Sequence, residues 1–179
     1  MQGLLRLSSG IDWLNTKLGW IAAWACGIAA AICAANAFVR YGLSYSSNAW
    51  LEIQWYLFAV CVMFGAAYVL KSNEHVRVDI IYTKLSTRGQ VMVDIIFTVL
   101  FLLTTMGFLA YICWPYFVRT YVSNEMSSTA GGLIRWPAVI TLPLGFALVF
   151  LQGVSEVIKR VGFLAGKHSM AASYERPLQ

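Results

Sequence analysis

The sequence is poor in charged residues, which make up only 12% of its 179 positions, whereas soluble domains carry about a quarter. Hydrophobic residues make up 59%, and the mean hydropathy is +0.67. This composition excludes a disordered chain and an ordinary water-soluble enzyme. Four cysteines in a chain of this length are also too few for a disulfide-rich secreted scaffold. The shortage of charge therefore indicates a membrane protein.

Residue types that carry catalysis or hold cofactors are also scarce. The two histidines, His75 and His168, fall outside every long apolar stretch, so no pair of intramembrane imidazoles is available to hold a haem. The four cysteines form no C-x-x-C pair, which thiol–disulfide exchange would need. The chain contains no H-E-x-x-H, no G-x-S-x-G and no glycine-rich phosphate loop. The sequence predicts no catalytic, cofactor-binding or metal site, and it argues against a membrane redox enzyme.

Four apolar stretches are each long enough to cross about 30 Å of hydrocarbon as a helix at 1.5 Å per residue. Four soluble helices that are apolar all round would leave no amphipathic shell to cover them. The first stretch is longer than the apolar core of a signal peptide, so we treat it as a span. The sequence predicts an all-α membrane protein, one membrane domain over residues 1–179, with four transmembrane helices at about 19–39, 50–70, 91–116 and 133–154.

Lysine and arginine are distributed unevenly between the segments that flank these spans. Ten of the thirteen lie in the N-terminal segment, the connection between the second and third spans, and the C-terminal segment. Because short cytoplasmic loops carry the excess of basic residues, we expect both termini to be cytoplasmic, with a tail over residues 155–179. The net charge of +5 then indicates contact with anionic lipid headgroups, and no nucleic-acid partner is predicted.

The segment before the first span predicts a short amphipathic helix over residues 9–18, lying at the membrane interface. Ser9 and Asp12 fit a capping box, which would start this helix near Gly10. The alternative is a water-exposed extension of the first transmembrane helix. The apolar residues that recur on one face of this segment are Leu7, Ile11, Leu14 and Leu18.

Two further local patterns concern the connections. The alternation of apolar and polar residues over 76–80 is compatible with a strand, but an interfacial turn or short helix suits so short a connection better. Thr87 and Gln90 form a second capping-box pattern, which places the start of the third helix near Arg88. Pro143 lies inside the fourth predicted span, where we expect it to bend the helix.

Only two acidic residues fall within the predicted spans, Glu52 at the start of the second and Asp94 at the start of the third. In a first turn, a carboxylate interacts favourably with the helix dipole, and a basic neighbour such as Arg40 or Arg88 would complete a structural role. Contact with another subunit is the alternative. Neither residue reaches the midplane, where the substrate and coupling-ion sites of transporters usually lie.

The first span carries a row of small residues at every fourth position. In lipid, small residues at this spacing let two helix backbones approach closely. The row suits a partner helix, although packing within this chain's own bundle is an equal alternative. The members of this small-residue row are Gly19, Ala23, Gly27, Ala31 and Ala35.

Several short motifs follow one another along the chain. They are Trp50-x-Glu52, Gly65-Ala66-Ala67-Tyr68, His75-Val76-Arg77-Val78-Asp79, Ser127-Ser128, Ile134-Arg135-Trp136-Pro137 and Leu142-Pro143-Leu144-Gly145. Taken in their order and spacing, these motifs resemble those of a known family, the small membrane subunit (DctQ family) of tripartite ATP-independent periplasmic (TRAP) transporters. The resemblance extends over about residues 10–160 and rests on the order of the motifs, because each motif alone is degenerate.

This resemblance implies a function that composition alone does not. It implies that a large membrane subunit (DctM type) holds the substrate and sodium sites, and that a periplasmic binding protein (DctP type) delivers the substrate, commonly an organic acid. The small subunit would pack against and anchor the stationary scaffold of the large one in a bacterial or archaeal cytoplasmic membrane. It would need no cofactor of its own, and sodium would bind in the large subunit.

The resemblance also suggests which residues matter. We expect structural roles, as polar ties to the large subunit or to lipid headgroups, for Glu52, His75, Arg77, Asp79 and Arg135. The charged candidates for contact with the binding protein, in the loop between the third and fourth spans and beside it, are Arg119, Glu125 and Arg135. The alternative function is a self-sufficient homo-oligomeric exporter or channel in which Glu52 is the proton site.

Overall fold

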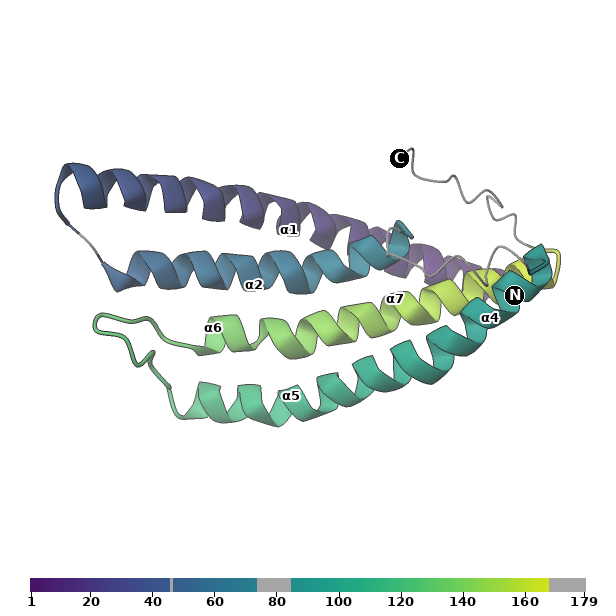
Figure 1. Ribbon diagram of the computed structural model, residues 1–179. Coiled ribbons are helices and arrows are strands. Elements are labelled where there is room, and N and C mark those ends of the chain that lie inside the picture. Colours follow the sequence, from purple (N-terminus) through teal and green to yellow (C-terminus); the bar gives the residue numbers. More distant parts are fainter. Residues whose placement is uncertain (46, 74–84, 168–179) are drawn as a thin grey trace.

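The computed structural model describes residues 1–45, 47–73 and 85–167. Within these ranges it is all-helical, apart from one isolated bridge between Met126 and Ile134, and four of its helical stretches are long and apolar enough to cross a membrane. The predicted fold class is confirmed (Figure 1). The elements are α1 (Gln2–Gly42), α2 (Asn48–Lys71), α4 (Thr87–Phe97), the π-helix η1 (Thr98–Leu103), α5 (Thr104–Val122), α6 (Trp136–Val139) and α7 (Thr141–Leu164).

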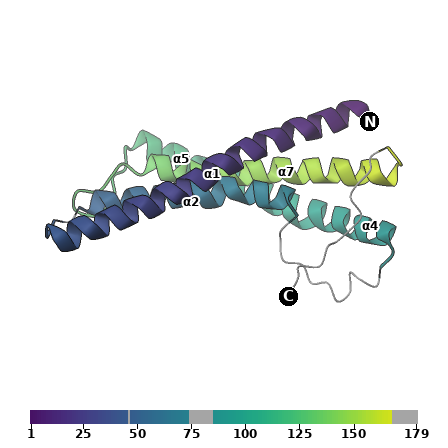
Figure 2. The same cartoon turned by 90° about the horizontal axis from the view of Figure 1, so that it is seen from above.

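The helices form a bundle in which α2 and α7 lie between α1 and α5 (Figure 1). Residues 43–45, which follow α1, and the loop over residues 123–135 lie at one end of the bundle, which we name the loop end. The start of α1, the start of α4 and the end of α7 lie at the other, which we name the terminal end. Seen from above, these three segments spread apart at the terminal end (Figure 2).

Helix α1 is continuous over 41 residues, so no separate helix covers residues 9–18. The capping box predicted at Ser9 is wrong, because its hydroxyl donates to the carbonyl of Leu5 one turn earlier, at 3.1 Å. No proline interrupts the sequence of α1, and nothing else there stops the helix. The backbone of α1 instead agrees with the alternative prediction, in which this segment is an extension of the first transmembrane helix.

The buried face of α1 repeats every seven residues, and we name it the heptad seam. The pattern is that of coiled coils and of most transmembrane bundles, in which neighbouring helices cross at about 20°. It is the face that α1 turns towards α2 and α7. Its buried members are Ser8, Ile11, Asn15, Ala22, Ala25 and Asn36, and its partly buried members are Leu18, Ala29, Ile32 and Val39.

The third span begins and bends differently from the prediction. Ser86, not Thr87, is its N-cap, and its hydroxyl accepts a hydrogen bond from the backbone N–H of Gly89 at 3.3 Å. The π-helical turns of η1 interrupt the α-helical ladder between α4 and α5. Because such an insertion changes the direction of a helix, η1 accounts for the bow of this span in Figure 1.

The fourth span is longer than predicted and is interrupted once. The short helix α6 ends at Val139, and α7 begins at Thr141. Pro143 has no N–H to donate to the carbonyl of Val139, and the hydroxyl of Thr141 donates to the carbonyl of Ala138 at 2.6 Å. Helix α7 then continues to Leu164, so the first ten residues of the predicted tail are helical.

Candidate functional site

A network of buried polar side chains joins α1 to α7 at the terminal end. At its centre is Gln152, which is fully buried. Its carbonyl oxygen accepts a hydrogen bond from Asn15 Nδ2 at 2.7 Å, and its own amide donates to Asp12 Oδ1 at 2.8 Å and to Glu156 Oε1 at 3.1 Å. A buried amide with both ends engaged holds the two helices at one axial offset.

Two hydroxyls and a lysine complete the contact between α1 and α7. Ser8 Oγ and Ser155 Oγ lie 2.7 Å apart, and Ser155 Oγ donates to Asp12 Oδ1 at 2.8 Å. The ammonium of Lys159 lies 3.1 Å from Asp12 Oδ2 and also pairs with Glu156. The charge of the partly buried Asp12 is therefore balanced by the ammonium of Lys159.

The same network extends to the third span and to the end of α2. Arg160, which is buried, contacts Asp94 Oδ2 on α4 at 3.2 Å and Glu156 Oε2 on its own helix at 2.8 Å. Lys71, at the end of α2, donates to the hydroxyl of Thr16 on α1 at 2.5 Å. All four spans are thus tied together at the terminal end.

The sequence prediction missed this network. Its α7 members lie on one helical face, at spacings of three, one, three and one, but most of them were assigned to a tail. Asp12 was interpreted only as part of a capping box, and the partner shown for Asp94 is Arg160, not Arg88. The helical spacing of polar residues at the end of an apolar stretch was the available signal: Gln152, Ser155, Glu156, Lys159 and Arg160.

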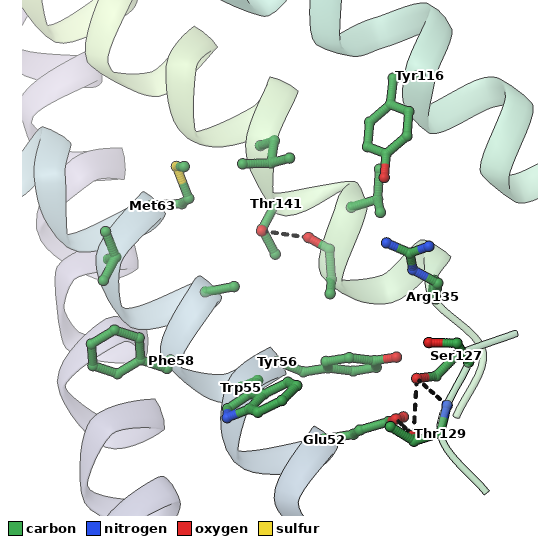
Figure 3. Close-up of a pocket in the computed structure, with 16 residues that line it drawn as sticks. Glu52, Trp55, Tyr56, Phe58, Met63, Tyr116, Ser127, Thr129, Arg135 and Thr141 are labelled. Atoms are coloured by element: carbon green, nitrogen blue, oxygen red, sulfur yellow. Dashed lines mark hydrogen bonds between the residues drawn. The ribbon is translucent and has the colours of Figure 1, made fainter. Parts of the chain in front are cut away.

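At the loop end, Glu52 holds the loop over residues 123–135 against α2. Its side chain is buried, with 3% of the residue exposed. Glu52 Oε2 accepts a hydrogen bond from the backbone N–H of Leu133 at 2.6 Å. Glu52 Oε1 accepts one from the hydroxyl of Thr129 (Figure 3). A Cβ at Gly132 would lie 2.9 Å from Oε1, so only glycine lets the loop come this close.

Three further contacts fix the same loop. Tyr56, one turn along α2 from Glu52, donates its hydroxyl to the carbonyl of Ile134 at 3.0 Å. Asn48 Nδ2 donates to the carbonyl of Ala130 at 2.9 Å. Within the loop, the N–H of Ser127 donates to the carbonyl of Leu133 at 2.9 Å. These hydrogen bonds therefore fix the position of the loop on the bundle.

The helix that carries Glu52 begins at Asn48, earlier than predicted, and the helix that carries Asp94 begins at Thr87, close to the predicted start near Arg88 and seven residues before Asp94. Both carboxylates therefore lie beyond the first turn, where the effect of the helix dipole has faded. The prediction of helix-start carboxylates is wrong on this point. Glu52 is held by loop hydrogen bonds and not by Arg40, and Asp94 is held by an ion pair.

The charged loop candidates are partly brought together. Arg135 pairs with Glu125, and the backbone N–H of Arg135 donates to the carbonyl of Glu125 at 2.9 Å. Arg119, near the end of α5, lies with its guanidinium 5.7 Å from the ring centre of Tyr116. His75, Arg77 and Asp79 lie outside the described residues.

The small-residue row on α1 is separate from the heptad seam. Gly19 alone lies against another helix, where a Cβ would meet the side chain of Tyr68 at 2.7 Å. A Cβ at Gly27 would meet nothing within 4 Å. The exposed members of the row are Ala23, Gly27, Ala31 and Ala35.

A groove of about 830 Å³ lies below the loop, between α2 on one side and α5, α6 and α7 on the other (Figure 3). Its polar lining gathers at the loop, with Glu52, Tyr56, Ser127, Thr129 and Arg135. The lining farther along the bundle is mostly apolar, but it also includes Thr141 and Tyr116. Its apolar members are Phe58, Ala59, Val62, Met63, Val139 and Leu142.

Within the described part of the chain, no three His, Cys, Asp or Glu side chains gather in a way that could hold a metal ion. The fold and its polar sites define a multi-pass integral membrane protein whose polar side chains join its own helices and loops. Residues 29–162 match the family model described as "Tripartite ATP-independent periplasmic transporters, DctQ component". The match covers well over half of the chain, and the protein belongs to this family, as the small membrane subunit of such a transporter. No curated protein and no solved structure matches the chain significantly.

Proposed function

We propose that this chain packs against the stationary scaffold of a large, DctM-type membrane subunit and anchors it in the bilayer. The large subunit would carry out sodium-coupled uptake of an organic acid that a DctP-type binding protein delivers. The contacts of Glu52 and Asp94 support a structural role for this chain. Both carboxylates inside the predicted spans are engaged by the chain's own loop or arginine.

One observation carries this proposal: the exposed part of the small-residue row on α1. The heptad seam and Gly19 already supply the contacts of α1 with α2 and α7, so the four exposed members of the row are left free to meet a partner. Small side chains on an outer face let a second helix approach closely and gain dispersion contacts. Leucine at Ala23 or Gly27 would therefore leave this chain intact and push a partner helix away.

The proposal includes an orientation, with both termini in the cytoplasm. Its support is the excess of lysine and arginine in the N-terminal segment, in the connection between the second and third spans, and in the C-terminal segment. The loop end would then face the periplasm and the binding protein. Exposed charges there, at Arg119 and in the pair of Arg135 with Glu125, would mainly tune the rate of encounter and its salt dependence.

The test is co-purification with the large subunit. Both chains are co-expressed, the complex is isolated through a tag on the large subunit, and the amount of this chain is compared between variants. Ala23→Leu combined with Gly27→Leu should lower its recovery at least fivefold. Thr105→Leu is the matched control, because it enlarges an exposed small side chain on α5 and should leave recovery unchanged.

Equal recovery of the double variant and the control would remove the small-residue row from the interface. The proposal as a whole would fail if this chain alone, reconstituted in liposomes, drove uptake of an organic acid. Circular dichroism of each purified variant shows that the helices are retained, so a loss of recovery reports on assembly.

A further inference from the structure

Helices α1 and α2 run antiparallel and pack on each other in one register (Figure 1). Three pairs of contacting residues define this register, because each step forward along α1 is matched by an equal step back along α2. The first pair is joined by a hydrogen bond, and in the other two a glycine lies close to the side chain opposite. The pairs are Thr16 with Lys71, Gly19 with Tyr68, and Ala22 with Gly65.

Continued by about one turn, this register sets Cys26 opposite Cys61. The Cys61 thiol lies within interaction distance of the Cys26 thiol. At the preceding pair, a Cβ at Gly65 would lie 3.7 Å from Ala22 Cβ, within the range of about 3.5–4.5 Å that separates the Cβ atoms of a disulfide. The fold thus brings together two cysteines that are far apart in the sequence and belong to no C-x-x-C motif.

The pair lies at the edge of the contact between the two helices, where it is open to the lipid. Cys26 is exposed on α1, and Cys61 is partly buried on α2. Cys26 lies seven residues beyond Gly19, where the predicted first span begins, which is about 10 Å into the span at 1.5 Å per residue. Charged thiols dissolved in water do not reach this depth, because moving a charge into hydrocarbon is costly. Apolar molecules dissolved in the bilayer do reach it.

We propose that Cys26 and Cys61 are a redox modification site, which a lipid-soluble organic hydroperoxide converts into a disulfide between α1 and α2. The exposed Cys26 sulfur attacks the hydroperoxide, its O–O bond breaks, and the products are an alcohol and a sulfenic acid. The Cys61 sulfur then attacks the sulfenic sulfur, which forms the S–S bond and releases water. The two thiols together lose two electrons and two protons, and the hydroperoxide gains them. The site goes beyond the scaffold function and does not depend on it.

The test counts free thiols in the full-length chain. The purified, reduced protein is treated with cumene hydroperoxide in detergent micelles, denatured and alkylated with N-ethylmaleimide, and mass spectrometry identifies the labelled cysteines. Wild-type protein should lose the label at both Cys26 and Cys61 and should yield a peptide pair joined through them. Dithiothreitol, added after denaturation, should restore both labels.

Matched variants separate this pair from the other two cysteines. The register sets Cys33 opposite Gln54, and Cys113 lies on α5, so Cys33→Ala combined with Cys113→Ala should form the disulfide at the wild-type rate. Cys26→Ala and Cys61→Ala should each lower disulfide formation within the chain at least tenfold. A crosslink restricts the unfolded chain, so the oxidised wild type should also unfold at a higher temperature than the reduced protein. Cys26→Ala should show no such rise.

Full labelling of Cys26 and Cys61 after the treatment would overturn the site. A disulfide through Cys33 or Cys113 in place of this pair would also overturn it, and so would oxidation of Cys26 to a sulfinic acid with Cys61 still free. A lower unfolding temperature after oxidation would show that the bond forms only by distorting the contact between α1 and α2, and would overturn the placement of the two thiols.

Discussion

Asn15 on α1 donates its side-chain amide to Gln152 on α7 at 2.7 Å, and both side chains are fully buried. The two residues are 137 positions apart, so this contact joins the first span to the last. Apolar side chains can slide past one another with little loss, whereas an amide pair is satisfied at one offset only. The pair therefore sets the register of α1 against α7.

Replacing either amide should destabilise the bundle more than replacing both. Asn15→Leu leaves Gln152 without its donor, which costs about 1–3 kcal/mol for a buried polar group. In the double variant with Gln152→Leu, the coupling recovered should be about 0.6–1.7 kcal/mol, the range found between membrane helices. Unfolding of the four proteins of this cycle in detergent micelles measures it, and additive effects would contradict it.

The ion pairs at the two ends of the bundle should differ in energy. Arg160 is 8% exposed at its side chain and contacts two carboxylates, so Arg160→Met should cost about 3–5 kcal/mol. Arg135, with 44% of its side chain exposed, has one such contact, and Arg135→Met should cost at most about 1 kcal/mol. Thermal unfolding of the two variants compares them, and equal losses would contradict the buried network.

Two glycines should respond in opposite directions to alanine. A Cβ at Gly145 on α7 would lie 2.6 Å from Met63 Cβ and 3.1 Å from Met63 Cα, so Gly145→Ala should destabilise the chain by about 1–3 kcal/mol. Gly27→Ala, in open space on α1, should stabilise it by about 0.5–1 kcal/mol through backbone entropy. A destabilised Gly27→Ala chain would mean that its outer face is already occupied within this protein.

Glu52→Gln should loosen the loop and leave transport by the assembled complex measurable. The amide oxygen of Gln can accept only a neutral hydrogen bond from the N–H of Leu133, which is weaker than the charge-assisted bond that Glu52 accepts. Hydrogen exchange should therefore speed up over residues 127–133. Thr129→Val removes only the neutral donor and should have a smaller effect. If Glu52→Gln abolished uptake while exchange in the loop stayed slow, a proton-binding role would be favoured.

Most of the fold was predictable, because an apolar run of about 20 residues has one stable state in a bilayer. The errors lie where a helix extends beyond its apolar part. The segments before Gly19 and after Val154 are amphipathic, and their polar side chains find partners on each other. A search for spans by hydropathy finds only the apolar part of each helix. The helix itself continues into the amphipathic segment beyond that part.

The candidate site was predictable in part. Glu52 stands out as an acidic residue in an apolar run, but its partners lie 77 and 81 residues later in a loop without periodicity. The small-residue row was visible, and so was the heptad seam, which went unnoticed because its members differ in polarity. Ser8, Asn15 and Asn36 occupy one heptad position at which alanine also occurs.

Because α1 is one continuous helix, the direction in which its first half faces fixes the direction in which its second half faces. Each residue turns the helix by about 100°, so deleting one residue between Asn15 and Ala22 would rotate the loop-end half away from α2 while the amides still held α7. A deletion or insertion of seven residues would keep the angle and change only the length. Changes in length are therefore best accommodated in the connections between helices, because α1 fixes the orientation of its two contact faces relative to each other.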